Sequence, residues 1–225
     1  MTDGELPCVS EVGELRQARL QDARLYVVTD TRRDRGDLET FLRAVTEASA
    51  DIVQLRDKDA DDAQLRESAN VFRQVCDDTG ALFVLNDRPD LAVEVGADGI
   101  HVGQDDASPD EVRAMVGPDM LIGLSTHSTA QVDAAADQDV DYIAVGPVHA
   151  TPTKPGRPAA GLEPVRYAAE HAAQPWFAIG GISPDTVGDV LGAGARRIVV
   201  VRAITQAADP AAATWTLRRA LGRVH

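Results

Sequence analysis

Short apolar runs alternate along the chain with longer stretches that mix alanine, apolar and charged residues. The runs are rich in β-branched residues and carry few charges, which is typical of parallel strands that are buried on both faces. They predict strands over residues 25–29, 52–55, 82–85, 99–102, 121–124, 142–145, 176–179 and 198–201.

A stretch with helical character follows each run. Two of these stretches begin with Ser-Pro, at Ser108 and Ser183, which places an N-cap hydroxyl before a proline at the first helical position. The predicted helices span 38–49, 61–79, 88–95, 108–116, 128–138, 162–172, 183–191 and 210–222. Eight strand–helix pairs predict an α/β protein with a (β/α)8 TIM barrel, and an open doubly wound sheet is the alternative. In either fold, ligands bind at the carboxyl ends of the strands.

Residues 1–22 lie outside this repeat and form an N-terminal extension, either a tail or an extra helix. The catalytic domain is therefore expected over residues 23–225. A chain of 225 residues with 44% hydrophobic content is long enough to bury one sizeable core.

Composition narrows the class of partner. The formal net charge is −14, which argues against a nucleic-acid-binding protein because phosphate backbones attract clustered basic residues. The chain lacks the ~18 continuous apolar residues that a membrane helix requires, and its acidic start lacks the basic region of a signal peptide. Cys8 and Cys76 show no metal or disulfide spacing. We expect a cytoplasmic protein with small-molecule substrates, no nucleic acid and no membrane partner, and leave open whether it is a homodimer.

Polar residues stand where the second strand ends. The two-residue period of a strand places Gln54, Arg56 and Lys58 on one face, with Leu55 on the other, towards the helices. Burying amide and charged groups inside a barrel is costly unless a polar or charged ligand meets them. The alternative is a solvated strand end with surface charges.

Carboxylates follow the third and fourth strands. Asn86-Asp87 ends the third, and His101 to Asp106 follows the start of the fourth. Two converging carboxylates suit Mg2+, which takes one or two protein carboxylates and completes its shell with water and phosphate oxygens. Helix capping is the alternative for one of Asp105 and Asp106.

The longest connection runs over residues 146–161 and contains Thr151, Thr153 and Lys154. Long loops in compact domains are typically lids or binding loops, and a lysine with hydroxyl groups suits a phosphate. A plain surface excursion is the alternative.

Glycines mark the end of the seventh strand. Gly180-Gly181 follows that strand and Arg202 follows the eighth, which is where many barrels bind phosphate. Among the histidines, His127 lies at the end of the fifth strand and His149 begins the long loop, whereas His101 lies within a strand and is expected to be structural.

Taken together, these blocks resemble the thiamine-phosphate synthase family, in its order and spacing, from about residue 24 to residue 210. The resemblance is carried by residues 25–30, 53–58, 86–88, 101–106, 123–125, 146–148, 151–154 and 179–182.

The resemblance implies a transferase that joins 4-amino-2-methyl-5-hydroxymethylpyrimidine diphosphate to 4-methyl-5-(2-hydroxyethyl)thiazole phosphate. Carbon–oxygen cleavage releases diphosphate and leaves a pyrimidine carbocation, which the thiazole nitrogen captures. By position, Gln54 and Ser125 would hold the pyrimidine, and Asp87 and Asp106 would hold Mg2+. The diphosphate would be bound by Arg56, Lys58, Asn86, Thr151, Thr153 and Lys154, and the thiazole phosphate by Gly181, Val201 and Arg202. Arg56, Lys58, Lys154 and Ser125 are the candidate catalytic residues.

One position departs from the family pattern, because Arg202 stands where the family often has serine. Two other functions remain open. A related thiazole tautomerase shares the barrel, the Gly-Gly loop and a histidine equivalent to His127, but it has no diphosphate to hold. Arg56 with Lys58, Asp106 and the 151–154 segment therefore favour the synthase. A non-catalytic phosphate-ligand binding protein is the other alternative.

Overall fold

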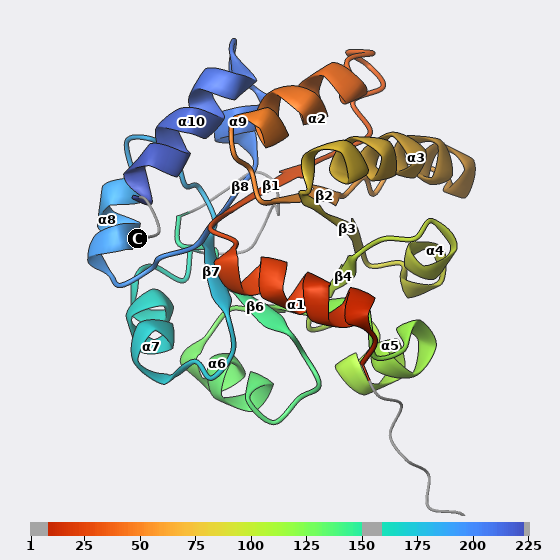
Figure 1. Cartoon of the computed structure of the whole chain (residues 1–225). Helices are drawn as coiled ribbons and strands as arrows, with labels where there is room; N and C mark the ends of the chain where they lie inside the picture. Colours follow the sequence, from red (N-terminus) through yellow and green to blue (C-terminus); the bar gives the residue numbers. More distant parts are fainter. Residues whose placement is uncertain (1–8, 150–158, 223–225) are drawn as a thin grey trace, which may run out of the picture.

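The computed structural model describes residues 9–149 and 159–222. Over these residues the chain forms eight parallel strands that close into a barrel in sequence order, with β1 paired to β8 (Figure 1). The predicted single-domain TIM barrel is confirmed, and the open sheet is excluded. The strands are β1 (Leu25–Thr29), β2 (Ile52–Leu55), β3 (Leu82–Asn86), β4 (Gly99–Val102), β5 (Leu121–Thr126), β6 (Tyr142–Val145), β7 (Trp176–Ile179) and β8 (Ile198–Val200).

Helices surround the barrel (Figure 1). They are α1 (Glu11–Asp22), α2 (Leu38–Glu47), α3 (Asp62–Thr79), α4 (Pro89–Glu94), α5 (Pro109–Val116), α6 (Thr129–Ala135), α7 (Glu163–His171), α8 (Val187–Gly192), α9 (Arg202–Thr205) and α10 (Pro210–Ala220). None of these helices is long and apolar enough to cross a membrane.

Two predicted helix starts have different outcomes. Ser108 caps α5 as expected. Its hydroxyl accepts from the Glu111 N–H, and the Ser108 N–H donates to the Glu111 carboxylate. Ser183 does not begin a helix: its N–H donates to the Thr186 hydroxyl in a turn, and α8 begins four residues later, at Val187. The prediction of a helix from residue 183 was therefore wrong at its start.

The core has two layers. Between barrel and helices lies a large apolar cluster that includes Leu55, Phe72 and Phe83. A smaller cluster fills the barrel interior, where the Tyr26 and Tyr142 rings meet edge-on with 6.0 Å between centroids. Leu55 thus faces the helices, while the tyrosines bring hydroxyl groups into the middle of the barrel.

Helix α1 closes the amino-terminal end of the barrel (Figure 1). Leu20 of this helix is fully buried in the interior cluster. The Arg16 side chain pairs with Asp98 at 3.0 Å, and the Ser10 hydroxyl donates to Asp119 at 2.7 Å. Asp98 directly precedes β4 and Asp119 lies two residues before β5, so α1 covers the end of the barrel at which the strands begin. The end at which they finish is left for ligands.

Candidate active site

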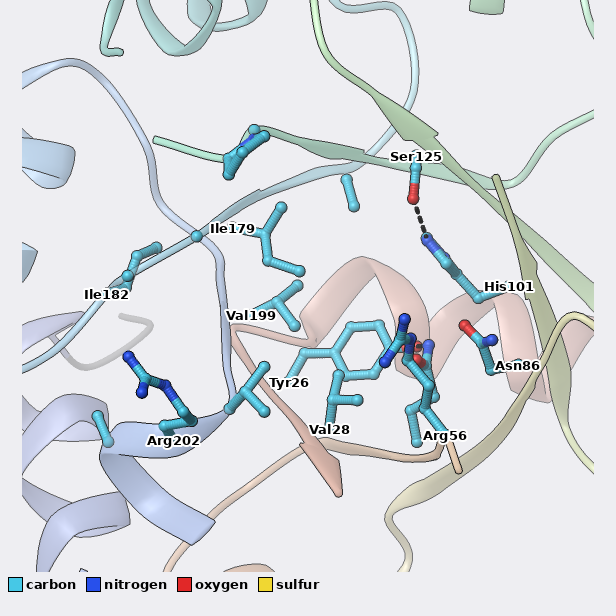
Figure 2. A pocket seen from close by; sticks show the side chains of 18 of the residues that line it. Tyr26, Val28, Arg56, Asn86, His101, Ser125, Ile179, Ile182, Val199 and Arg202 are labelled. Carbon is cyan, nitrogen blue, oxygen red and sulfur yellow. Dashed lines mark hydrogen bonds between the residues drawn. The ribbon is translucent and has the colours of Figure 1, made fainter. Parts of the chain in front are cut away.

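A cavity of about 370 Å³ opens at the carboxyl ends of the strands. Figure 2 shows Arg56 and Asn86 on one side of it and Ile182 and Arg202 on the opposite side. Seven of the residues predicted from the sequence line this cavity: Gln54, Arg56, Asn86, Ser125, Gly181, Val201 and Arg202.

The side-chain amide of Gln54 lies at the base of the cavity. Gln54 is buried, lines the cavity, and donates from Nε2 to the Tyr26 hydroxyl at 2.5 Å. Burial raises the pKa of Tyr26 above its usual range, so this hydroxyl stays protonated at neutral pH. A polar group is therefore held at the base of the cavity by a neutral partner.

Ser125 is held by a histidine. His101 Nε2 lies 3.0 Å from the Ser125 hydroxyl, and His101 Nδ1 lies 3.2 Å from the Tyr142 hydroxyl. Figure 2 marks the bond between His101 and Ser125 with a dashed line. The Gln104 side-chain amide donates to the Ser125 carbonyl at 2.7 Å. His101, expected from the sequence to be structural, therefore both lines the cavity and orients a predicted site residue.

The two cations after β2 differ in exposure. Arg56 is half-buried on the cavity wall, and its backbone N–H bonds to the Thr29 carbonyl at 2.8 Å. The Lys58 side chain is 62% exposed and pairs with Asp87 at 3.4 Å. Lys58 is not among the residues that line the cavity.

Asp87 and Asp106 come together beside Lys58, and neither is among the residues that line the cavity. Burial raises the pKa of Asp87, and the neighbouring Asp106 carboxylate raises it further. Asp106 accepts from the Gly103 N–H at 2.8 Å, and Asp87 adopts a left-handed backbone conformation with φ of 61°. Since Ser108 caps α5, the capping alternative for Asp105 or Asp106 is wrong.

Two adjacent carboxylates repel each other unless a cation lies between or beside them. In the part of the chain that the structure describes, no group of three or more His, Cys, Asp and Glu residues gathers to form a metal cage. A pair of carboxylates fits a hard cation that takes its remaining ligands from water and substrate.

The opposite side of the mouth is built from backbone. Gly180 and Gly181 have φ of 110° and 64°, which side chains rarely tolerate. A Cβ on Gly180 would lie 2.5 Å from Pro147, and a Cβ on Gly181 would lie 2.7 Å from the His149 Cβ. Glycine is therefore required at both positions for the loop after β7 to pack against the loop after β6.

Arg202 lies beside this glycine turn. It is the first residue of α9, follows Val201, and is an exposed part of the cavity lining. Helix α9 was not predicted, because four residues are too short for a periodic pattern. The arginine adds a cation to this side of the mouth.

Some predicted residues lie outside the described part of the chain, namely Thr151, Thr153 and Lys154 of the 146–161 connection. The sequence interpretation missed the contribution of Tyr26 and Tyr142. The signal was present: the period of β1 that places Val28 inside also places Tyr26 inside, where a hydroxyl needs a partner.

The fold and this cavity define a (β/α)8-barrel enzyme whose site is formed at the carboxyl ends of the strands. Residues 25–204 match the model of a family described as thiamine monophosphate synthase. The chain belongs to this family, and it is a transferase.

Close relatives support the assignment along most of the chain. It is 54% identical over 211 residues to a thiamine-phosphate synthase of Thermobifida fusca, covering 92% of this chain and 96% of the relative. It is 50% identical over 214 residues to the same enzyme of Saccharopolyspora erythraea, covering 92% and 96%. The structure of a thiamine phosphate pyrophosphorylase from Pyrococcus furiosus superposes with a TM-score of 0.80 at 32% identity, covering 91% of this chain and 96% of that one.

Proposed function

We propose that the protein couples 4-amino-2-methyl-5-hydroxymethylpyrimidine diphosphate with 4-methyl-5-(2-hydroxyethyl)thiazole phosphate, giving thiamine phosphate and diphosphate. One observation carries the proposal: a single cavity joins a hydrogen-bonding base, a cationic side and a glycine turn. These three parts correspond to a heterocycle, a diphosphate and a second phosphate.

The pyrimidine lies on the base of the cavity in this proposal. Gln54 and Ser125 both line the cavity and are both held by buried partners, so their polar atoms are fixed before substrate arrives. Preorganised groups bind a planar heterocycle without a further ordering cost.

The diphosphate lies at the cationic side, against Arg56 and Asn86, with Lys58 two residues after Arg56 and paired with Asp87. Thr151, Thr153 and Lys154 would complete this subsite in the proposal; they lie outside the described residues. A guanidinium offers paired N–H donors that match phosphate oxygens, and lysine adds a mobile charge.

Asp87 and Asp106 would hold Mg2+ beside this subsite. Their adjacency, together with the raised pKa of Asp87, supports a cation-binding role. When bound, the cation supplies positive charge that offsets the charge of the diphosphate.

The thiazole phosphate lies at the glycine side, against Gly181, Val201 and Arg202. Glycine allows backbone N–H groups to approach phosphate oxygens closely, and Arg202 adds charge.

The reaction breaks the bond between the pyrimidine methylene carbon and the diphosphate oxygen, and the bonding electrons leave with the diphosphate. The thiazole nitrogen lone pair then forms the new carbon–nitrogen bond. Negative charge grows on the leaving group, so cations fixed nearby stabilise the transition state more than the bound substrate. One cation about 4 Å from a phosphate oxygen contributes at most ~4 kcal/mol at an effective dielectric near 20.

The test is a two-substrate assay with Mg2+, in which diphosphate and thiamine phosphate are both quantified. Equimolar formation of the two products is expected, and it should stop in excess EDTA and return with added Mg2+. Isomerisation of a thiazole phosphate without pyrimidine would identify a tautomerase instead. Stoichiometric binding without turnover would identify a binding protein, and full activity in EDTA would remove the Mg2+ role from Asp87 and Asp106.

A further inference from the structure

We infer that a buried chain of hydrogen bonds through Tyr26, Tyr142 and His101 fixes the direction in which Ser125, at the base of the cavity, bonds to a ligand. Ser125 is left to donate, while Gln54 keeps its oxygen and one amide hydrogen for the ligand. The site is thereby made selective for a 4-aminopyrimidine over a 4-oxopyrimidine. This inference deepens the proposed function and rests on it.

The chain has four links across the barrel interior. Gln54 Nε2 donates to the Tyr26 hydroxyl at 2.5 Å, and the Tyr26 and Tyr142 hydroxyls are 3.1 Å apart. His101 Nδ1 lies 3.2 Å from the Tyr142 hydroxyl, and His101 Nε2 lies 3.0 Å from the Ser125 hydroxyl. The four links join residues from β1, β2, β4, β5 and β6.

The first link sets the direction of the others when every buried proton of the chain has a partner. Because Tyr26 accepts from the Gln54 amide, its one proton is available for the Tyr142 oxygen. Tyr142 in turn gives its proton to His101 Nδ1, so the imidazole carries its hydrogen on Nε2.

The last link then leaves one donor for the ligand. His101 Nε2–H donates to the Ser125 oxygen, and the proton of Ser125 is directed to the cavity. Burial raises the pKa of both Tyr26 and Tyr142, so each hydroxyl keeps its proton at neutral pH. At the other end, the Gln54 amide uses one of its two hydrogens on Tyr26, so its oxygen and its second hydrogen remain for the ligand.

This pattern is complementary to one kind of pyrimidine edge. A 4-aminopyrimidine offers an amino N–H donor beside a ring nitrogen acceptor, which match the Gln54 oxygen and the Ser125 hydroxyl. A 4-oxopyrimidine with a protonated ring nitrogen offers the reverse, acceptor beside donor. To bind it, the protein would have to reverse the chain or leave the Ser125 proton unpaired opposite the ring N–H, and unpaired polar groups reject analogues strongly.

A second feature, Gly123, indicates that the barrel is built around this chain. A Cβ at Gly123 would lie 2.1 Å from Tyr142 Cζ and 2.6 Å from His101 Nδ1. No side chain fits at this position while Tyr142 and His101 remain in contact. The residue that makes room for the link stands two positions before Ser125, which the link serves.

The direction of the chain can be measured without turnover. In protein labelled with 15N-histidine and free of substrate and metal, nitrogen chemical shifts report which ring nitrogen carries hydrogen. The His101 signals are assigned as those missing from His101→Asn. We expect the Nε2–H tautomer for His101; the Nδ1–H tautomer would mean that the chain runs the other way and would overturn the inference.

Selectivity is measured as the ratio of kcat/KM for the 4-amino and the 4-oxo pyrimidine diphosphates. Tyr142→Phe removes the hydroxyl that directs His101, so we expect the ratio to fall about tenfold or more, the effect of one hydrogen bond of ~1.4 kcal/mol. Tyr26→Phe interrupts the chain one link earlier and should lower the ratio in the same direction. If both substrates lose activity equally in both variants, the tyrosines have only a structural role and the inference fails.

Tyr167→Phe is the matched control. It removes the hydroxyl of a tyrosine in α7 that bonds to Asp133 in α6; neither residue lines the cavity, so the ratio should stay unchanged. Should Tyr142→Phe fail to fold, Tyr26→Phe and the tautomer of the unmodified protein still decide the outcome. Unmodified protein that makes no thiamine phosphate from the 4-amino substrate would refute the proposed function, whereas the tautomer would still test the direction of the chain.

Discussion

The two sides of the barrel mouth present different kinds of chemical group to a ligand. The side formed by β2, β3 and β4 presents charged side chains, including Arg56, Lys58 and Asp87. The side formed by β7 and β8 presents the backbone of Gly180 and Gly181, which exclude any side chain by conformation and by contact, together with the exposed side chain of Arg202. A charged side chain can move as the charge on the ligand changes, whereas a fixed turn binds only a group of matching shape.

The proposed reaction explains why the two sides differ. The diphosphate gains charge as its bond breaks, so the cations on its side bind the transition state more tightly than the substrate. The thiazole phosphate keeps its charge throughout, so the glycine side needs only to hold it. Substitutions on the cationic side should therefore lower kcat, and substitutions on the glycine side should raise the KM of the thiazole phosphate.

The largest expected effect is that of Arg56→Ala. It removes a half-buried cation from the wall of the cavity. We expect kcat to fall on the order of 100- to 1000-fold, since ~1.4 kcal/mol is a factor of ten in rate and one cation supplies up to ~4 kcal/mol. The measurement is diphosphate release with both substrates saturating.

Arg66→Ala is the control for this substitution. Arg66 pairs with Glu94 at 2.6 Å on the outer surface, so its loss should leave kcat unchanged. A large rise in the KM of the pyrimidine substrate with normal kcat in Arg56→Ala would show that Arg56 binds the ground state and the transition state equally.

The second effect is that of Gly181→Ala. The new side chain meets the His149 Cβ and disfavours the φ of 64°, so the turn must shift. We expect the KM of the thiazole phosphate to rise about tenfold or more, with little change in kcat, because a left-handed alanine alone costs about 1–2 kcal/mol. Steady-state kinetics with the pyrimidine substrate saturating gives both constants.

Gly188→Ala provides the comparison for the glycine side. This glycine lies in α8, and a Cβ there meets nothing within 4 Å. Both constants should stay normal, and the helix should gain up to about 1 kcal/mol. A drop in kcat with unchanged KM in Gly181→Ala would contradict the division of labour between the two sides.

The sequence was sufficient to predict the barrel, because its strands are buried on both faces and appear as uninterrupted apolar runs. It was less informative where two local signals coincide. Ser108 and Ser183 both precede proline, but Glu111 completes a capping box three residues after Ser108, whereas Thr186 holds Ser183 in a turn. The residue three positions further along was the distinguishing signal.

The strand ends also gave most of the cavity lining, because the two-residue period fixes which side chains face inward. The groups beneath them could not be found by spacing. Tyr26 and Tyr142 are 116 residues apart, and His101 and Tyr142 are 41 apart. The folded barrel brings these partners together. Spacing could not predict the position of α1 either, because its Arg16 pairs with Asp98, 82 residues further along the chain.

The smallest expected effect comes from removing the charge of Asp87, on the cationic side, while keeping the size of its side chain. Asp87→Asn in metal-free protein should raise Tm at neutral pH by no more than about 4 °C, the shift that ~1 kcal/mol produces in a domain of this size. Burial and Asp106 raise the pKa of Asp87 in the folded state, so ionised Asp87 costs stability above that pKa. Asparagine removes the charge and tolerates the left-handed backbone at this position.

The dependence on pH provides the decisive check. As pH falls through the raised pKa, folded Asp87 takes up a proton before the unfolded chain does, so the cost disappears and the two proteins should converge in Tm. Asp90→Asn should behave in the opposite way, because hydrogen bonds from Arg88 lower the pKa of Asp90 and its charge favours folding above the unfolded pKa. Calorimetry across acidic and neutral pH measures both. A lower Tm for Asp87→Asn at neutral pH would show that Lys58 already compensates the carboxylate, leaving no uncompensated charge to attract a divalent cation.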